Sequence, residues 1–217
     1  MKEKINKNTY FFIVIIVCIA FVQIVWKLMT SFFPDIPVEY SSRFIEASMG
    51  AAAFFLCKTT NFVQPWLGIR VEKGNRRKTV ITCVLIAAGI TAFYITTRLI
   101  LQNFIPEIAA RPFFKTYIDV KLRKIYLFAV IVQELLSKGV LQHGMEKALP
   151  KEKYKTAILV TAAIFGMLHI HTSPYYILGA MGLAVVSGII YHKQGNIWAS
   201  VTLHFFLAFL PRCFGLK

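Results

Sequence analysis

The stretch FAVIVQELLSKGVLQHG, residues 128–144, decides the fold class because it sets polar and charged side chains inside an apolar run. Gln133, Glu134 and Lys138 lie within this run, between aliphatic neighbours. An Asp, Lys or Arg at the centre of a membrane-spanning helix costs about 2.5–3.5 kcal/mol on insertion scales, and ionisable residues at such depth mark functional sites by default. The stretch therefore predicts a membrane helix that carries a functional site.

The composition of the whole chain agrees with a protein that is dissolved in lipid. Of its 217 residues, 57% are hydrophobic and 16% are charged. A soluble domain averages about 45–50% apolar and about 25% charged residues. The length suits one domain, and no Gly/Ser-rich linker divides it. We expect a single membrane domain over residues 1–217.

The formal net charge of +15 comes largely from basic residues in short connections between apolar runs, such as 70–78 and 151–155. This placement favours contact with anionic membrane lipids, and we expect no nucleic acid partner. The N-terminal tail and the 70–78 connection are basic, whereas the intervening PDIPVEY stretch is acidic. We therefore expect the N-terminus to face the cytoplasm, in a bacterial plasma membrane.

Hydrophobic runs predict an all-α polytopic membrane bundle of about seven transmembrane helices, since about 20 apolar residues cross the hydrocarbon. We expect an interfacial amphipathic helix over 106–124. Small residues in GAMGLAVVSG, residues 179–188, favour close helix approach. The expected spans are Tyr10–Met29, Phe44–Val63, Val80–Leu101, Ile125–Met145, Thr156–Ile170, Tyr175–Tyr191 and Ile197–Leu210.

Three deep polar positions are candidates for a site: Glu134 with Lys138, His169 and His204. Taken singly, Glu134 and Lys138 suit a self-neutralising pair four residues apart, and each histidine suits a core residue bonded to a carbonyl. Taken together, they predict convergence of separate helices on one water-accessible cavity, with Gln133 at its edge. A carboxylate beside an imidazole is suited to activate a water molecule.

Metal and disulfide chemistry are not indicated by the pattern. His169 and His171 are two residues apart, so they point to nearly opposite sides of a helix. We expect no metal and no cofactor. The four cysteines lack C-x-x-C spacing and are expected to be small reduced hydrophobes. These cysteines are Cys18, Cys57, Cys83 and Cys213.

Three segments in order resemble the motifs of a known family. QELLSK (133–138), FGMLH (165–169) and HFFLA (204–208) are similar to E-E-x-x-x-R, F-x-x-x-H and H-x-x-x-N. The flanking stretches LLSKGVLQ and GNIWASVTLH, the latter containing Asn196, are similar as well. The chain resembles the CPBP family, also named the CAAX-protease and bacteriocin-processing or Abi family, which includes type II CAAX prenyl proteases and lysostaphin-resistance-like proteins.

The resemblance implies a glutamic-type intramembrane endopeptidase with a catalytic-type core over 125–210, preceded by N-terminal helices in 1–105. In the family, the first glutamate and the second motif's histidine activate water, and the last histidine and asparagine stabilise the oxyanion. The resemblance places the catalytic positions at Gln133, Glu134, His169 and His204. It places supporting positions at Lys138, Phe165, Asn196 and Ala208.

Three of these positions depart from the family pattern: Gln133 for glutamate, Lys138 for arginine and Ala208 for asparagine. A glutamine amide cannot act as a general base, a contribution typically worth about 10²–10⁴-fold. Deletion of an oxyanion donor costs about 10²–10³-fold elsewhere. Lysine keeps the charge of arginine but lacks its planar fork. All three changes predict weaker hydrolysis.

Three functions remain open from the sequence. The first is a family member with weakened or lost peptidase activity that binds a membrane-associated peptide or protein, as a chaperone, an immunity factor or a regulator of envelope enzymes. The second is an active intramembrane peptidase that uses Glu134, His169 and His204. The third is a small transporter or metal-handling protein built around the same three side chains.

Overall fold

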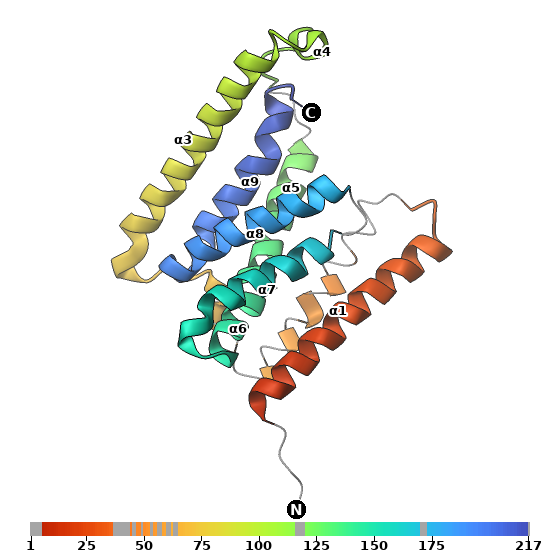
Figure 1. Cartoon of the computed structure of the whole chain (residues 1–217), viewed down its shortest axis with the longest axis vertical. Coiled ribbons are helices and arrows are strands. Elements are labelled where there is room, and N and C mark those ends of the chain that lie inside the picture. The colour runs from red at the N-terminus through yellow and green to blue at the C-terminus, as the bar shows by residue number, and fades with distance from the viewer. Residues whose placement is uncertain are drawn as a thin grey trace, which may run out of the picture.

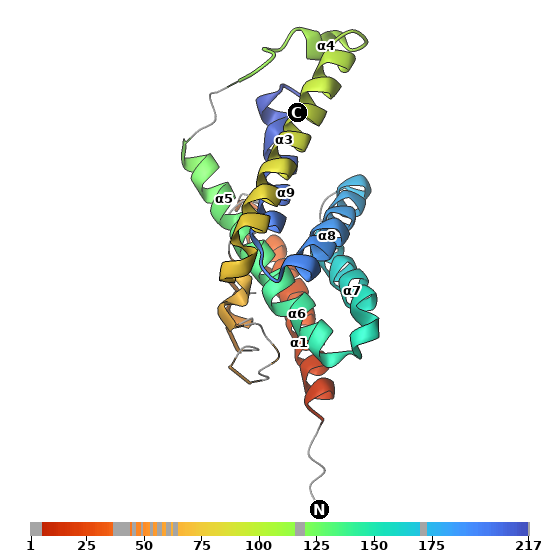
Figure 2. The same cartoon turned by 90° about the vertical axis from the view of Figure 1, so that its left-hand side faces the viewer.

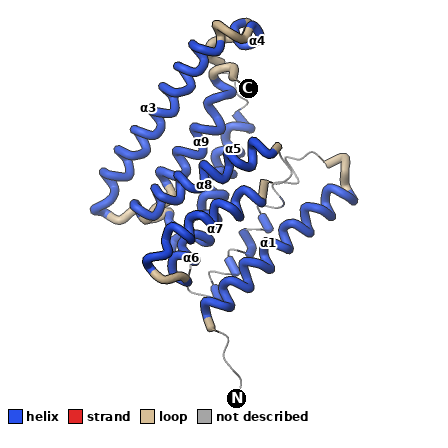
Figure 3. Tube along the Cα trace, viewed as in Figure 1, coloured by secondary structure: helices blue, strands red, loops and turns tan. Residues whose placement is uncertain are grey.

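The secondary structure of the described residues is entirely helical, as Figure 3 shows, which confirms the all-α prediction. The structure is a computed structural model. It describes residues 6–36, 65–115, 120–169 and 173–216, together with residues 44, 47, 48, 50–52, 54, 55, 58, 59 and 62.

Long helices follow most of the predicted apolar runs, and the order of their labels is that of Figure 1. The expected span Phe44–Val63 lies largely outside the described residues. The main helices are α1 (Lys7–Phe32), α3 (Arg76–Leu101), α5 (Val120–Glu134), α6 (His143–Ala148), α7 (Tyr154–Met167), α8 (Pro174–Gln194) and α9 (Trp198–Cys213). Shorter helical segments are η1 (Pro65–Gly68), η2 (Lys73–Asn75), α4 (Pro106–Ala109), η3 (Leu135–Gln142) and η4 (Lys151–Lys153).

Three described stretches are long and apolar enough to cross a membrane: Lys7–Phe32, Trp66–Leu101 and Pro174–Gln194. The predicted number of seven is not confirmed. Helices α7 and α9 have 14 and 16 residues. At 1.5 Å per residue they are about 21–24 Å long, which is shorter than the hydrocarbon core of about 30 Å.

The region between α3 and α5 differs from the expected interfacial helix over 106–124. Helix α4 has four residues, and the chain from 110 to 115 is irregular before α5 begins at Val120. Within this region, Lys115 N donates to the carbonyl of Cys213, so part of the connection binds to the end of α9. The described residues therefore do not form one continuous amphipathic helix here.

The expected span Ile125–Met145 is one helical rod of three parts, α5, η3 and α6. Its central part, η3, is a π-helix of eight residues, LLSKGVLQ. Hydrogen bonds in a π-helix run over five residues instead of four, and such segments are frequent at functional sites. The wider turn changes which side chains share a face, and it begins directly after Glu134.

Small residues bring α7, α8 and η3 close together, as the sequence predicted. Ala180, Ala184 and Gly188 follow one another at four-residue intervals on the buried side of α8. A Cβ added to Gly188 would lie 2.8 Å from Gln142 Oε1 and 3.0 Å from Ile158 Cγ2. Gly179 and Gly182 have open space instead. The stripe that permits close packing thus has a period of four along α8.

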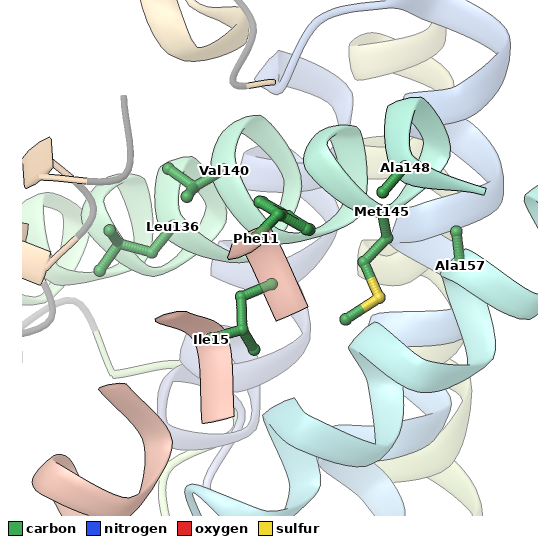
Figure 4. Close-up of a cluster of buried hydrophobic side chains, with 7 residues drawn as sticks. All are labelled: Phe11, Ile15, Leu136, Val140, Met145, Ala148 and Ala157. Carbon is green, nitrogen blue, oxygen red and sulfur yellow. The ribbon is translucent and has the colours of Figure 1, made fainter. Parts of the chain in front are cut away.

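Helix α1 packs through one end of its buried face against η3 and α6. Phe11 is fully buried, and its ring contacts the position where a Cβ of Gly144 would stand. Figure 4 shows Phe11 and Ile15 pointing toward the helix that carries Val140 and Met145. The core cluster around Phe11 therefore attaches the N-terminal helix to the central rod.

Segment η1 forms a left-handed turn that fixes two elements of the bundle. Trp66, Leu67 and Gly68 have φ values of 63°, 51° and 77°. A Cβ on Gly139 of η3 would collide with the carbonyl group of Leu67. The carbonyl of Gly68 accepts a 3.0 Å bond from Ile197 N, at the start of α9. The turn thus holds η3 and the beginning of α9.

Helices α3 and α9 lie side by side, which both views show (Figures 1 and 2). Tyr94 Oη donates a 2.8 Å hydrogen bond to the carbonyl of Leu207 on α9. Around this bond, Ile90 packs with Leu203 and Leu210. This contact orients the face of α9 that carries His204 toward the rest of the bundle.

Candidate functional site

The centre of the candidate site is a hydrogen bond between Glu134 and His204. The Nδ1 atom of His204 lies 2.8 Å from Glu134 Oε1, across 70 residues of sequence. Because a carboxylate accepts, the imidazole Nδ1–H donates. Glu134 ends α5 and is 1% exposed, and His204 lies in the middle of α9 and is 7% exposed. The structure thus joins two predicted site residues from different helices in a buried pair.

Lys138 has a different partner from the one its spacing suggested. Its Nζ donates a 2.9 Å bond to the carbonyl of Ala184 on α8, and no ion pair with Glu134 occurs among the described residues. Lys138 lies in η3, where four residues no longer make a full turn. Glu134 is therefore bonded to α9, while Lys138 is bonded to α8.

His169 lies just past the end of α7 and not within the helix, contrary to the expected span Thr156–Ile170. Helix α7 ends at Met167, and His169 N bonds to the carbonyl of Gly166 in a tightened last turn. The carbonyl of Phe165 accepts a 2.7 Å bond from His169 Nδ1. A side chain therefore satisfies a carbonyl at the helix end. His171 lies outside the described residues.

The ring of Phe165 contacts both histidines of the site. Its centroid lies 4.9 Å from that of His169 and 6.0 Å from that of His204, the latter edge to face. The His169 ring also lies 5.7 Å from the ring of Tyr176, near the start of α8. Glu134, His204, Phe165 and His169 are thus linked in one continuous set of contacts.

Residues 121–210 match the family described as "Type II CAAX prenyl endopeptidase Rce1-like". This region is Rce1-like. No curated protein and no solved structure matched the chain in the same comparisons. Over residues 121–210, the match agrees with the predicted resemblance to CAAX prenyl proteases. Together with three described helices that are long and apolar enough to cross a membrane, it indicates an integral membrane protein.

The Rce1-like region includes all three predicted motifs, and two of their substituted positions lie beside the buried pair. Gln133 precedes Glu134 on α5 and is partly buried. Ala208 follows His204 by one turn of α9 and is also partly buried. Both positions therefore remain candidates for groups that face a ligand, although they carry an amide and a methyl group.

Asn196, a predicted supporting residue, lies at the other end of α9 in the Rce1-like region. Its Nδ2 donates to Thr79 Oγ1 at 3.0 Å and to the carbonyl of Gln194 at 3.2 Å. Its Oδ1 accepts from the backbone N–H of Trp198 at 3.3 Å. These bonds connect the α8–α9 turn to α3, so Asn196 orients the beginning of the helix that carries His204.

Several buried polar atoms have no hydrogen-bond partner among the residues that the structure describes. The second carboxylate oxygen of Glu134, Oε2, is one of them, and Ser137 Oγ and Thr161 Oγ1 are others. Buried polar groups are usually hydrogen-bonded, and each exception needs an explanation. These three oxygens retain the capacity to bind polar groups of a ligand.

The sequence did not predict the buried polar side chains that connect η3 and α9 to the backbone of α8. Ser200 Oγ donates to the carbonyl of Ser187 at 3.0 Å, and Gln142 Nε2 donates to the carbonyl of Gly188 at 2.9 Å. One signal was present, because Ser200 precedes His204 by one helical turn. Among the described residues, no group of three or more His, Cys, Asp or Glu side chains is placed to hold a metal ion.

Proposed function

We propose that this Rce1-like membrane protein binds a membrane-associated peptide at the site around Glu134, His169 and His204, and that its peptidase activity is weakened or lost. The family's printed description names a CAAX prenyl endopeptidase. The ligand class that follows is a lipid-modified C-terminal peptide or a protein that carries one. A binding role of this kind suits a chaperone, an immunity factor or a regulator of envelope enzymes.

The observation that carries the proposal is the engagement of Glu134 by His204. Glu134 Oε1 accepts a hydrogen bond from Nδ1 of His204 at 2.8 Å, and Glu134 Oε2 is buried. In this arrangement Glu134 serves to orient His204, because Oε1 accepts from the imidazole and Oε2 is enclosed. The base would then have to come from position 133, where an amide stands. Binding contacts survive this change, but proton abstraction does not.

The later steps of hydrolysis also lack a side chain that stabilises the oxyanion. Hydrolysis adds water to the peptide carbonyl carbon, breaks the C–N bond and gives the water proton to the leaving amine. The developing oxyanion needs a hydrogen-bond donor, and Ala208 offers none at the position of the family's asparagine. Because Nδ1–H of His204 donates to Glu134, Nε2 of the neutral imidazole is an acceptor and offers the oxyanion no proton. Weak binding of the transition state therefore accompanies the missing base.

The test measures binding and cleavage of a farnesylated peptide with a C-terminal C-a-a-X sequence. The peptide is labelled on both sides of the bond that follows cysteine. We expect the purified full chain in detergent to bind this peptide without measurable cleavage. Gln133→Glu should restore cleavage by about 10²-fold or more over the wild-type level, because it restores a general base. Gln102→Glu, beyond the end of α3, is the matched control and should stay inactive. Cleavage by the wild type at the rate of Gln133→Glu, or failure of both to bind, would contradict the proposal.

An active peptidase is the second candidate, and the retention of Glu134, His169 and His204 in the three motifs favours it. A carboxylate that holds an imidazole orients it and stabilises its protonated form. If the wild type cleaves the peptide, His204→Gln should abolish cleavage and leave binding within about threefold. In the binding-only case, His204→Gln changes no cleavage rate because there is none to lose.

We further propose a bacterial plasma membrane and a cytoplasmic N-terminus. The support is the basic tail before α1 and the basic connection before α3. Single cysteines at Asn6 and at Gly74, in a background without the native cysteines, should both react with a membrane-impermeant maleimide only after the membrane is opened. Reaction of either cysteine in sealed right-side-out vesicles would reverse this topology.

A further inference from the structure

The backbone of α8 accepts hydrogen bonds from side chains of two neighbouring elements within five residues. Lys138 Nζ donates to the carbonyl of Ala184, and Ser200 Oγ donates to that of Ser187. Gln142 Nε2 donates to the carbonyl of Gly188. All three donors are buried; two come from η3 and one comes from α9. Helix α8 contributes only backbone oxygens to these three bonds.

The spacing of these donors relates them to the Glu134–His204 pair. Lys138 follows Glu134 by four residues, and Ser200 precedes His204 by four residues. The two accepting carbonyls, at Ala184 and Ser187, are three residues apart and so lie on one face of α8. Each member of the pair is therefore flanked, about one turn away, by a side chain bonded to the same short piece of backbone.

We infer that residues 184–188 of α8 position the pair, with Ser200 as the positioning residue for His204 and Lys138 as the positioning residue for Glu134. Ser200 fixes the rotation of α9 about its axis through the carbonyl of Ser187, and Lys138 fixes that of η3 through the carbonyl of Ala184. The 2.8 Å distance between Nδ1 and Oε1 follows from both rotations. The importance of this arrangement for peptide binding rests on the proposed function, whereas its geometry does not.

The composition of α8 makes this arrangement possible. Side chains reach the carbonyls of a neighbouring helix only where that helix lacks bulk, and positions 184, 187 and 188 are Ala, Ser and Gly. Ser187 Oγ also donates to the carbonyl of Ala184, at 3.3 Å, so this carbonyl accepts from both Lys138 and Ser187. These small residues thus serve as more than a close-packing surface.

The test is the hydrogen bond of the pair itself, observed by NMR in the full chain in detergent micelles with ¹⁵N-labelled histidine. His204→Gln assigns the Nδ1 proton of His204. In the wild type we expect this proton at low field and in slow exchange with water. Ser200→Ala should move it to higher field and speed its exchange about fivefold, which corresponds to about 1 kcal/mol. Thr202→Val is the matched control, because Thr202 Oγ1 bonds only within α9, to the carbonyl of Trp198.

The outcomes separate this inference from the proposed function. A shift with Ser200→Ala and none with Thr202→Val supports the positioning role, whether or not the farnesylated peptide binds. Equal spectra for the wild type and Ser200→Ala overturn it, and so does the absence of a protected Nδ1 proton in the wild type. Lys138→Met provides the second arm and should produce the same shift from the η3 side. If peptide binding fails while Ser200→Ala shifts the proton, only the proposed function is refuted.

Discussion

The Nζ atom of Lys138 donates a 2.9 Å hydrogen bond to the carbonyl oxygen of Ala184, although Glu134 stands four residues before it in the chain. The two charged residues of the motif thus attach the same rod to two different helices. Glu134 reaches α9 through His204, and Lys138 reaches α8. The hydrogen bond of each residue is therefore a long-range contact with another helix.

The stem of Lys138 is expected to contribute more to stability than its charge. Lys138 is fully buried, so Lys138→Ala should leave a cavity and cost about 2–5 kcal/mol, as for large apolar side chains. Lys138→Met fills most of that volume and loses mainly one hydrogen bond, about 0.5–1.5 kcal/mol. Thermal unfolding in detergent measures both, with the exposed Lys153→Met as control. Equal losses for the Ala and Met variants would show that the charge dominates.

Gly139 is expected to tolerate no side chain. An added Cβ would meet the backbone carbonyl of Leu67, and backbone cannot rotate away as a side chain can. Gly139→Ala should therefore destabilise the fold by about 1–3 kcal/mol, the usual cost of overpacking. Gly179→Ala is the matched control, since it has open space and should be neutral or slightly stabilising. The midpoint of thermal unfolding distinguishes them, and a loss in both variants would point to a general intolerance of alanine.

Phe11 is expected to anchor α1 to the central rod. It is fully buried in the cluster that Figure 4 shows, so Phe11→Ala should cost about 3–5 kcal/mol. Phe21, on the same helix, is 54% exposed, and Phe21→Ala should change stability by less than about 0.5 kcal/mol. Limited proteolysis of the α1 connection in detergent provides a second readout. Equal protease resistance of Phe11→Ala and the wild type would argue that α1 is held elsewhere.

Restoring the oxyanion donor is expected to matter only when the base is present. In the Gln133→Glu background, Ala208→Asn should raise peptide cleavage by a further factor of about 10²–10³. In the wild-type background the same change should produce no measurable cleavage, because no base activates the water. Initial rates with the farnesylated peptide test both statements. Cleavage by the Ala208→Asn single variant would indicate that Glu134 acts as base after all.

The sequence predicted the all-helical class because long apolar runs leave few alternatives for a backbone in lipid, but it did not predict the number of spans. It also predicted that Glu134 and the histidines lie on converging helices, and the contact between Glu134 and His204 agrees with that expectation. The small residues of α8 were identified as a packing surface. These small residues also leave the backbone carbonyls of α8 accessible to side chains of neighbouring elements. Which elements pack there cannot be read from a single sequence.

Two local features escaped prediction for a physical reason. The π-helix at residues 135–142 has the same apolar pattern as an α-helix, since one added residue per turn leaves no mark on composition. The left-handed turn at Trp66 and Leu67 uses residues that disfavour positive φ, so local preference points away from it. Tertiary contacts with Gly139 and Ile197 select this turn, and neither contact is local in sequence.

The contact between Leu67 and Gly139 has a consequence for chain exchange. Leu67 lies outside the Rce1-like region, and Gly139 lies inside it. A chimera that joins residues 121–210 to the N-terminal helices of another membrane protein would present Gly139 with a foreign surface. Such a graft should fold only when the donor supplies a backbone segment of the same shape. The two portions of the chain are therefore expected to evolve as matched halves and not as interchangeable parts.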